Sequence, residues 1–105
     1  MAFPIHRYRR LRQSEGLLRM VRETSLSTDD LIEPFFVCEG SGVRQEISSM
    51  PGVHRLSIDN VVSEVKAGCS LGIPAMILFG IPDKKDDLGS EAYNPDGVVQ
   101  RAIRE

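Results

Sequence analysis

The chain has 105 residues, of which 41% are hydrophobic and 27% charged, with a formal net charge of −2 at pH 7. This length fits one domain, and the composition excludes an intrinsically disordered chain. The longest apolar run, Pro74 to Pro82, has the length of a strand, so no membrane protein is indicated. The first residues lack the apolar stretch of a signal peptide, and we therefore expect a cytoplasmic location.

Residues 1–24 are expected to form an N-terminal arm that ends in a short helix. Arginines crowd the first 22 residues against a single acidic residue, Glu15; they are Arg7, Arg9, Arg10, Arg12, Arg19 and Arg22. Residues 1–13 show no sustained period, which favours an extended arm that a partner surface orders. From the capping residue Ser14 onward, Leu17, Leu18 and Val21 recur at helical spacing and predict the helix.

The segment LIEPFFVCEG, residues 31–40, predicts a strand because it is rich in aromatic and branched residues and ends at a glycine. Pro34 argues against a central strand, since proline has no N–H to donate to a neighbour. Turn residues at Gly40 to Gly42 and at Pro51-Gly52 then predict a small hairpin at the end of this strand.

The clearest helix begins at Ser57. Its apolar residues recur at i, i+3, i+4, i+7 and i+11, and the stop is Gly72 followed by Pro74; the stripe consists of Ile58, Val61, Val62, Val65 and Cys69. The following AMILFGI, residues 75–81, is apolar at every position, which is typical of a strand buried on both faces of a parallel sheet. Strand, helix and strand make a βαβ unit.

A long polar loop then leads from Phe79 to Gly97, and loops of more than about 12 residues are usually functional or disordered. Asn94 is the expected cap of a last helix, with Pro95 in its first turn. Its apolar face comprises Val98, Val99, Ala102 and Ile103. Because two parallel strands cannot bury their outer edges, and the last helix leads to no strand, we expect the sequence to be a fragment of a larger α/β protein.

Residues that carry chemistry are few. Cys38 and Cys69 have no metal-ligand spacing and are expected to be buried thiols. His6 and His54 have no carboxylate or thiol at supporting spacing. The Asp86-Asp87 pair is interpreted as solvated loop charge, and Asp96 as a residue at the start of a helix.

Four strings together resemble the N-terminal third of the porphobilinogen synthase (5-aminolevulinate dehydratase) family. They are RYRRLR at 7–12, MVRETSLSTDDLIEPFFVCEG at 20–40, SMPGVHRLSID at 49–59, and GIPAMILFGIP with the following KKDDLGSEAYNPDGVVQRAIR. The resemblance implies a (β/α)₈ TIM barrel preceded by an arm that wraps a neighbouring subunit in a homo-octamer. Residues 25–105 would then be the first part of the barrel: strand 1, a hairpin-like insertion, helix 1, strand 2, a long loop and the start of helix 2. The long loop would lie on the active-site face.

The resemblance also implies an activity. The family's enzymes are lyases of tetrapyrrole (heme) biosynthesis that condense two 5-aminolevulinate molecules to porphobilinogen, using two Schiff-base lysines and, in different members, zinc or magnesium. Lys66, Lys84 and Lys85 match no Schiff-base motif and are interpreted as solvated, with a substrate carboxylate as the alternative contact for Lys84 or Lys85. The zinc cysteines are absent here too. We therefore predict no catalytic residue and no metal ligand in this chain, and no activity from it alone.

Two site predictions remain. The resemblance indicates Phe79, at the end of the second strand, as an aromatic wall beside one substrate, against ordinary barrel-core packing. Arg7, Arg9, Arg10 and Arg12 are predicted to contact a neighbouring subunit; phosphate binding is disfavoured because only Phe3 and Tyr8 supply stacking aromatics. The alternative for the whole chain is a non-catalytic, truncated fragment that acts as an arm-mediated oligomerisation or interaction module.

Overall fold

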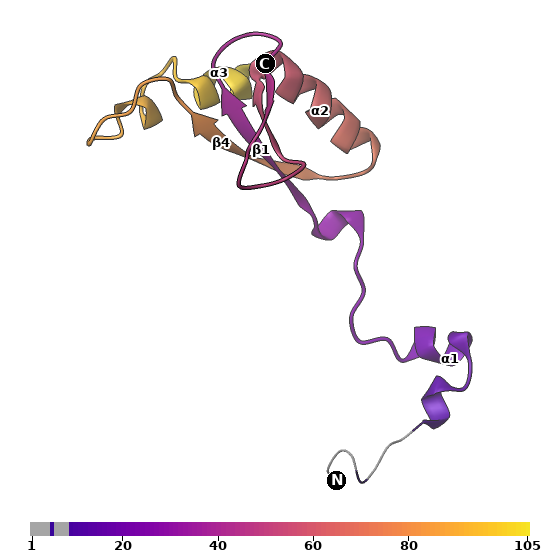
Figure 1. Ribbon diagram of the computed structural model, residues 1–105. Helices are drawn as coiled ribbons and strands as arrows, with labels where there is room; N and C mark the ends of the chain where they lie inside the picture. The colour runs from indigo at the N-terminus through magenta and orange to yellow at the C-terminus, as the bar shows by residue number, and fades with distance from the viewer. Residues whose placement is uncertain (1–4, 6–8) are drawn as a thin grey trace.

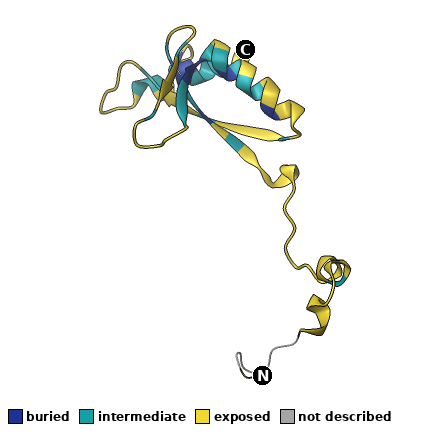
Figure 2. Cartoon of the chain, turned by 45° about the vertical axis from the view of Figure 1, so that its right-hand side comes forward, coloured by how far each residue is buried: buried dark blue, intermediate teal, exposed yellow. Residues whose placement is uncertain are grey.

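The computed structural model describes Ile5 and residues 9–105 and shows an arm that projects from an α/β body (Figure 1). The arm contains two 3₁₀ turns, η1 (Arg10–Arg12) and η2 (Thr28–Asp30), on either side of the helix α1 (Glu15–Met20). Ser14 caps α1, because its Oγ accepts a hydrogen bond from Leu17 N at 3.3 Å, and this confirms the predicted short helix. No residue between 9 and 30 is buried, so the body does not hold the arm (Figure 2).

The body is a four-stranded sheet in the order β2-β3-β1-β4, with α2 (Ile58–Ser70) and α3 (Val98–Arg104) on one of its faces (Figure 1). The strands are β1 (Ile32–Cys38), β2 (Arg44–Glu46), β3 (His54–Ser57) and β4 (Ala75–Ile81). β1 runs parallel to β3 and β4, whereas β2 and β3 form an antiparallel hairpin. The predicted hairpin therefore exists, and it extends the sheet beyond β1.

The expectation that Pro34 keeps its strand out of the sheet interior is wrong. β1 has neighbours on both sides, but β3 pairs only with residues 36–38 of it, whereas β4 pairs with residues 32–38. At Pro34 one side of β1 therefore has no partner strand in the described part of the chain. A missing N–H is tolerated at a position that is locally an edge.

The hydrophobic core lies between the sheet and the two helices. Its buried side chains come from β1, β3, α2 and α3; they are Phe35, Val37, Leu56, Val61 and Val98. Burying an aliphatic or aromatic side chain of this kind contributes about 1.5–3 kcal/mol. Helix α2 begins after Ser57 and ends at the predicted stop, where Gly72 has φ +86° and Ile73 N donates to Gly68 O at 3.2 Å.

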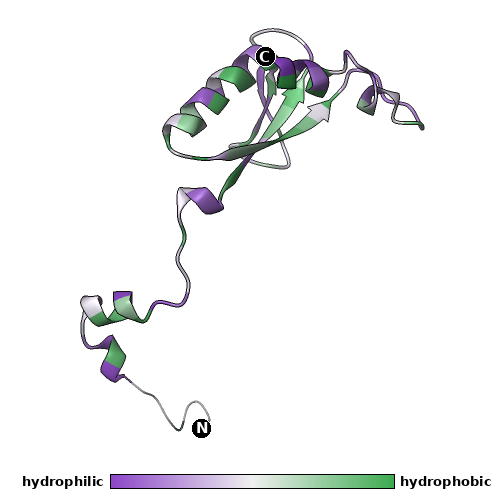
Figure 3. Cartoon of the chain, turned by 180° about the vertical axis from the view of Figure 1, so that it is seen from behind, coloured by the Kyte–Doolittle hydropathy of each residue, from purple (hydrophilic) through white to green (hydrophobic). Residues whose placement is uncertain are grey.

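Burial of β4 on both faces was predicted, and this is wrong for the described chain. Met76, Ile77 and Phe79 are 43–45% exposed, because β4 is an edge strand and only one face of the sheet has helices over it. β1 and β4 are nevertheless hydrophobic along most of their length (Figure 3). A continuous apolar run thus identifies the strand without showing which of its faces is covered.

Three smaller predictions also fail. Helix α3 begins at Val98 after Gly97, while Asn94 closes a turn in which its Oδ1 accepts from Asp96 N at 3.0 Å. Ile103 lies on the outer side of α3 and is exposed. Cys69, in the last turn of α2, is an exposed free thiol, whereas Cys38 is buried as predicted.

Candidate active site at the carboxyl ends of the strands

The sheet face that carries no helix presents a row of four side chains, one from each strand. The register pairs Gln45 with Arg55, Arg55 with Phe36, and Phe36 with Phe79. Adjacent residues of a strand point to opposite faces. The row is two residues from the ends of β1 and β4, close to the carboxyl edge of the sheet.

The residues one position further along β3, β1 and β4 show that the row of four side chains faces away from the helices. Leu56 and Val37 are paired in register and are buried in the core under the helices. A Cβ built on Gly80, the partner of Val37 in β4, would lie 2.6 Å from Cγ2 of Val99 in α3. The residues before these three, including Phe79, therefore face away from the helices. We refer to this side as the open face.

Phe36 and Phe79 form an aromatic surface on the open face. Their ring centroids are 5.5 Å apart with an interplanar angle of 28°, and Phe79 is 45% exposed. Such a stack adds about 0.5–1.5 kcal/mol to the burial of the rings. Phe79 thus lies on an accessible face near a strand end, and its role as a substrate wall stays a prediction.

Arg55 pairs with Phe36 in register and has no acidic partner among the residues that the structure describes. Its Nε is buried and has no hydrogen-bond acceptor, which is true of no other buried side-chain nitrogen or oxygen among the described residues. Within the same residues none of the ion pairs includes Arg55. The Arg55 guanidinium therefore has at least one N–H group without an acceptor among the described residues.

Cys38 lies one row nearer the carboxyl end on the open face. Burial raises the pKa of its thiol above the ordinary 9.0, although the positive charge of Arg55 acts in the opposite direction. A thiol with a raised pKa is protonated at neutral pH, and the thiolate is the form that ligates metals and attacks electrophiles. Cys38 is buried, and burial favours its protonated form.

The loop after β1 is fixed to the start of α2. Val43 N donates to Ser57 Oγ at 2.9 Å, Asn60 Nδ2 donates to Val43 O at 2.8 Å, and Gly42 N donates to Asp59 Oδ2 at 3.0 Å. Hydrogen bonds from the Ser57 hydroxyl and from Gly42 N lower the pKa of the Asp59 carboxyl. Together these bonds hold one loop of the candidate site rigidly.

The loop after β4 encloses a cleft of about 460 Å³ on the other side of the sheet. Its lining includes Gly80 and Val99, which face the helices, together with Lys84, Lys85 and Asp86. The Ser90 hydroxyl and Ser90 N both donate to Asp86 and lower the pKa of its carboxyl. The two lysines line this cleft together with residues that face the helices, and Phe79 is not among the lining residues.

An ion pair connects α3 to the end of β1. Arg101 Nη2 donates to Glu39 Oε2, and Arg101 Nε donates to Asp96 O at 3.0 Å. The Glu39 carboxylate raises the pKa of Arg101. The ends of β1 and β4 are therefore held in register by the helix behind them as well as by the sheet.

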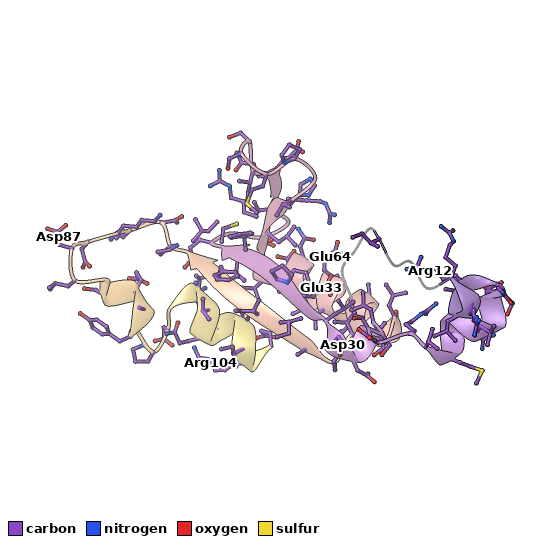
Figure 4. All side chains as sticks on the ribbon, turned by 90° about the horizontal axis from the view of Figure 1, so that it is seen from below. Arg12, Asp30, Glu33, Glu64, Asp87 and Arg104 are labelled. Carbon is purple, nitrogen blue, oxygen red and sulfur yellow. The ribbon has the colours of Figure 1, made fainter. Side chains whose placement is uncertain are left out.

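The arm carries Arg12 to a position far from this site (Figure 4). Arg9, Arg10 and Arg12 are exposed and belong to none of the ion pairs in the described residues, while Arg7 lies outside them. Figure 4 shows Arg12 on the arm and Asp87 on the long loop at opposite ends of the molecule. The arm also exposes apolar side chains, including Met20 at 83% and Leu26 at 79%.

Neither a metal site nor a membrane span is found in the part of the chain that the structure describes. It contains no group of three or more His, Cys, Asp or Glu side chains that could hold an ion. His54 is therefore not part of a ligand set there, and His6 lies outside the described residues. No helix in that part is long and apolar enough to cross a membrane.

Sequence reasoning missed Gln45, Arg55 and Phe36 as site residues. Each lies in a segment whose strand character was visible, but the row depends on the pairing of three strands that are far apart in sequence. The signal in the sequence was a charged residue, Arg55, inside the short strand segment VHRLS. A charged side chain at that position indicates that the face it occupies is not part of the apolar core.

The comparisons with known proteins agree with one another. A family model described as delta-aminolevulinic acid dehydratase matches residues 5–105. The delta-aminolevulinic acid dehydratase of Halalkalibacterium halodurans is 59% identical over 99 residues, which are 94% of this chain and 30% of that protein. The Bacillus subtilis enzyme of the same name is 46% identical over 105 residues, 100% of this chain and 32% of that protein.

A solved structure matches as well. It is the crystal structure of delta-aminolevulinic acid dehydratase (porphobilinogen synthase) from Toxoplasma gondii ME49 in complex with the reaction product porphobilinogen. The TM-score is 0.86 at 38% identity, over 93% of this chain and 28% of that one. The chain thus spans about 30% of the length of these curated relatives.

Proposed function

The chain belongs to the delta-aminolevulinic acid dehydratase family, and on that premise we propose that it contributes to a porphobilinogen synthase. The reaction would be the condensation of two 5-aminolevulinate molecules to porphobilinogen with loss of water, a lyase step of tetrapyrrole biosynthesis. The observation that carries the proposal is the structural match, at a TM-score of 0.86, to a synthase that holds this product.

We propose that β1 and β4 are the first two strands of a (β/α)₈ barrel. The order β1, α2, β4 with parallel pairing and helices on one face is the repeating unit of such a barrel. The open face would then be the inner face of the barrel, with the row that contains Phe36 and Phe79 near its carboxyl end. Active sites of these barrels lie at that end, which supports Phe79 as a wall of the substrate pocket.

The chain would supply binding surface rather than the reacting amines. Lys84 and Lys85 line the cleft on the helix side of the sheet, and Lys66 is exposed on α2. None of them shares the open face with Phe79. A Schiff base needs a lysine amine beside the substrate carbonyl, so we assign the amines to other parts of the enzyme.

The same holds for the metal. The family depends on a metal ion, but the described residues form no ligand set, and Cys38 is a single protonated thiol. These residues do not fit a zinc site, which needs three or four ligands, nor a carboxylate site for magnesium. We therefore assign no step of the reaction to a metal held by this chain.

We propose that the arm packs on a neighbouring subunit of a homo-oligomer, an octamer. Arg9, Arg10 and Arg12 and the arm's large apolar side chains Met20 and Leu26 are exposed. A projecting segment of this composition gains stability from a partner surface. We propose a cytoplasmic location, which the free thiols of Cys38 and Cys69 support.

The second candidate is a non-catalytic interaction module that works through the arm. The separation of Lys84 and Lys85 from the open face favours it for the chain by itself. A chimera distinguishes the two. The residues of this chain replace the matching 99 residues of the Halalkalibacterium halodurans relative, and conversion of 5-aminolevulinate to a pyrrole is measured beside the isolated chain.

We expect the chimera to form the pyrrole and the isolated chain to form none. A parallel chimera with the matching segment of the Bacillus subtilis enzyme controls for damage at the junction. If the control turns over while the chimera folds, assembles and remains inactive, the synthase proposal is wrong and the interaction module is favoured.

A further inference from the structure

Three polar side chains of α3 reach back to the loop that precedes this helix. Each donates to a backbone carbonyl of that loop; the pairs are Gln100 Nε2 to Ala92 O at 2.8 Å, Arg101 Nε to Asp96 O at 3.0 Å and Arg104 Nη2 to Pro95 O at 3.0 Å. A Cβ built on Gly97 would lie 2.8 Å from Glu91 O, so the backbone is closely packed where the loop meets the helix. Residues 91–97 are therefore attached to α3.

Arg101 also contacts a second loop. Its Nη2 donates to Oε2 of Glu39, the residue that follows β1 and lies 62 positions earlier in the sequence. The side chains of Arg101 and Glu39 are 40% and 29% exposed, which makes this the least exposed ion pair of the described residues. Solvent and salt screen such a pair less than a fully exposed one. One planar guanidinium thus joins the end of the loop after β4 to the loop after β1.

The loop after β1 is the fixed partner in this contact. Its residues Gly42 and Val43 donate their N–H groups to Asp59 Oδ2 at 3.0 Å and to Ser57 Oγ at 2.9 Å, at the start of α2. These bonds do not involve Glu39. Loss of the ion pair therefore leaves the loop after β1 attached to α2, and removes a restraint from the loop after β4.

We propose that Arg101 couples the two loops, so that breaking its pair with Glu39 loosens residues 91–97. The coupling fixes one wall of the cleft after β4, because Glu91 and Ala92 line that cleft. It does not depend on the synthase proposal, since both loops and both charged partners belong to this chain. Failure of either proposal leaves the other standing.

Hydrogen exchange of the 105-residue chain, followed by mass spectrometry, measures how often each loop opens. A peptide that covers residues 91–97 reports the restrained segment, where Asp96 N and Gly97 N both donate to Asn94. A peptide from α2 is the internal reference for global unfolding. The variants are Glu39→Gln, which removes the charge at nearly constant size, together with Arg101→Gln and Arg101→Lys.

Arg44→Gln is the matched control. Arg44 Nη1 lies 2.7 Å from Glu64 Oε1, so the variant also breaks an ion pair between an arginine and a glutamate. That pair joins β2 to α2 and does not include residues 91–97 or α3.

We expect Glu39→Gln to accelerate exchange in residues 91–97 by about 1.5- to 5-fold, as for the loss of a partly exposed ion pair, although Glu39 lies on the other loop. Arg101→Gln should accelerate it more, because the bond to Asp96 O is lost as well. Arg101→Lys keeps the charge but not the planar fork, so its rate should lie between those of the unsubstituted chain and Arg101→Gln. Arg44→Gln should leave residues 91–97 unchanged.

The double variant Glu39→Gln/Arg101→Gln tests whether the two residues act as a unit. If they do, residues 91–97 should exchange as fast in the double variant as in Arg101→Gln alone. Accelerations that multiply in the double variant would overturn the inference, and so would unchanged exchange of this segment in Glu39→Gln. Equal acceleration of the α2 peptide would overturn it too, because that result indicates a global loss of stability instead of a loosened loop.

Discussion

The two faces of the sheet use neighbouring residues of the same strands for different purposes. Val37 and Leu56 are buried under the helices, while Phe36 and Arg55, one position earlier in each strand, lie on the open face. The covered face holds the chain together by apolar burial. The open face carries a stacked aromatic pair and Arg55, whose buried Nε has no acceptor in the described part of the chain. The buried apolar residues and the residues of the candidate site are thus separated by a single step along the backbone.

This separation has a physical origin. Side chains alternate across a strand, so a residue and its successor experience different environments although their backbones belong to one ladder. A face that binds a ligand has to keep polar groups incompletely satisfied, and that lowers stability. Apolar burial on the covered face compensates for this loss of stability. Substitutions on each face can test the difference, because they should change the free energy of unfolding by different amounts.

The largest expected effect is on the covered face. Leu56→Ala removes a side chain that is 4% exposed, and we expect the free energy of unfolding to fall by about 2–5 kcal/mol. Urea unfolding of the chain, followed by circular dichroism, measures the change. Arg55→Gln is the matched control on the open face; it removes a buried donor that has no acceptor among the described residues, so it should not lower the free energy of unfolding. Equal losses in the two variants would contradict the division between the faces.

Gly80 tests the contact of β4 with α3. A Cβ at this position would lie 2.6 Å from Val99 Cγ2 and 3.3 Å from Val98 Cγ1. Gly80→Ala should therefore push α3 away from the sheet and cost about 1–3 kcal/mol, which the same unfolding experiment reports.

The control for this prediction is Gly16→Ala. Gly16 lies in α1, and the nearest atom to an added Cβ is Ser14 Oγ at 3.9 Å. Alanine favours a helix over glycine, so no loss is expected there. A Gly80→Ala variant as stable as the unsubstituted chain would show that the helix adapts freely and that the covered face is less tightly packed than its distances indicate.

The helices and strands of this fold can be predicted from the sequence, but which face of each strand is covered by helices cannot. Gly72, with φ +86°, marks the end of α2 because a left-handed glycine is a local effect, whereas Ser57 precedes α2 without a side-chain cap bond and accepts from Val43 N instead. In β4 every residue is apolar, so no alternation shows which residues the helices cover. The row of Arg55, Phe36 and Phe79 depends on pairings between β1, β3 and β4, which only the folded sheet reveals. Phe79 was predicted as a pocket residue from family resemblance, and that role stays a prediction, whereas Arg55 was singled out only from the register.

The smallest expected effect concerns the loop that borders the site, and it depends on pH. Hydrogen bonds from Ser57 and Gly42 hold the pKa of Asp59 below its ordinary 3.8 in the folded chain. A depressed carboxyl pKa stabilises the fold above the ordinary value, and this contribution is lost as the pH falls through the folded pKa. In the unsubstituted chain the urea concentration at the unfolding midpoint should fall as the pH is lowered from about 5 to about 2. In Asp59→Asn this fall should be smaller.

Asp87→Asn is the control, because it also removes one carboxylate but from a different loop, the one after β4 (Figure 4). Asp87 is not among the groups that bond to Asp59. The effect of Asp59→Asn should be small, because the carboxyl is exposed to solvent and screened. Identical acid profiles for the unsubstituted chain and Asp59→Asn would mean that the bond from Gly42 N to Asp59 does not hold the loop. The loop after β1 would then be as adjustable as the open face it borders, and the rigid edge we infer for the site would have to come from Ser57 and Asn60 alone.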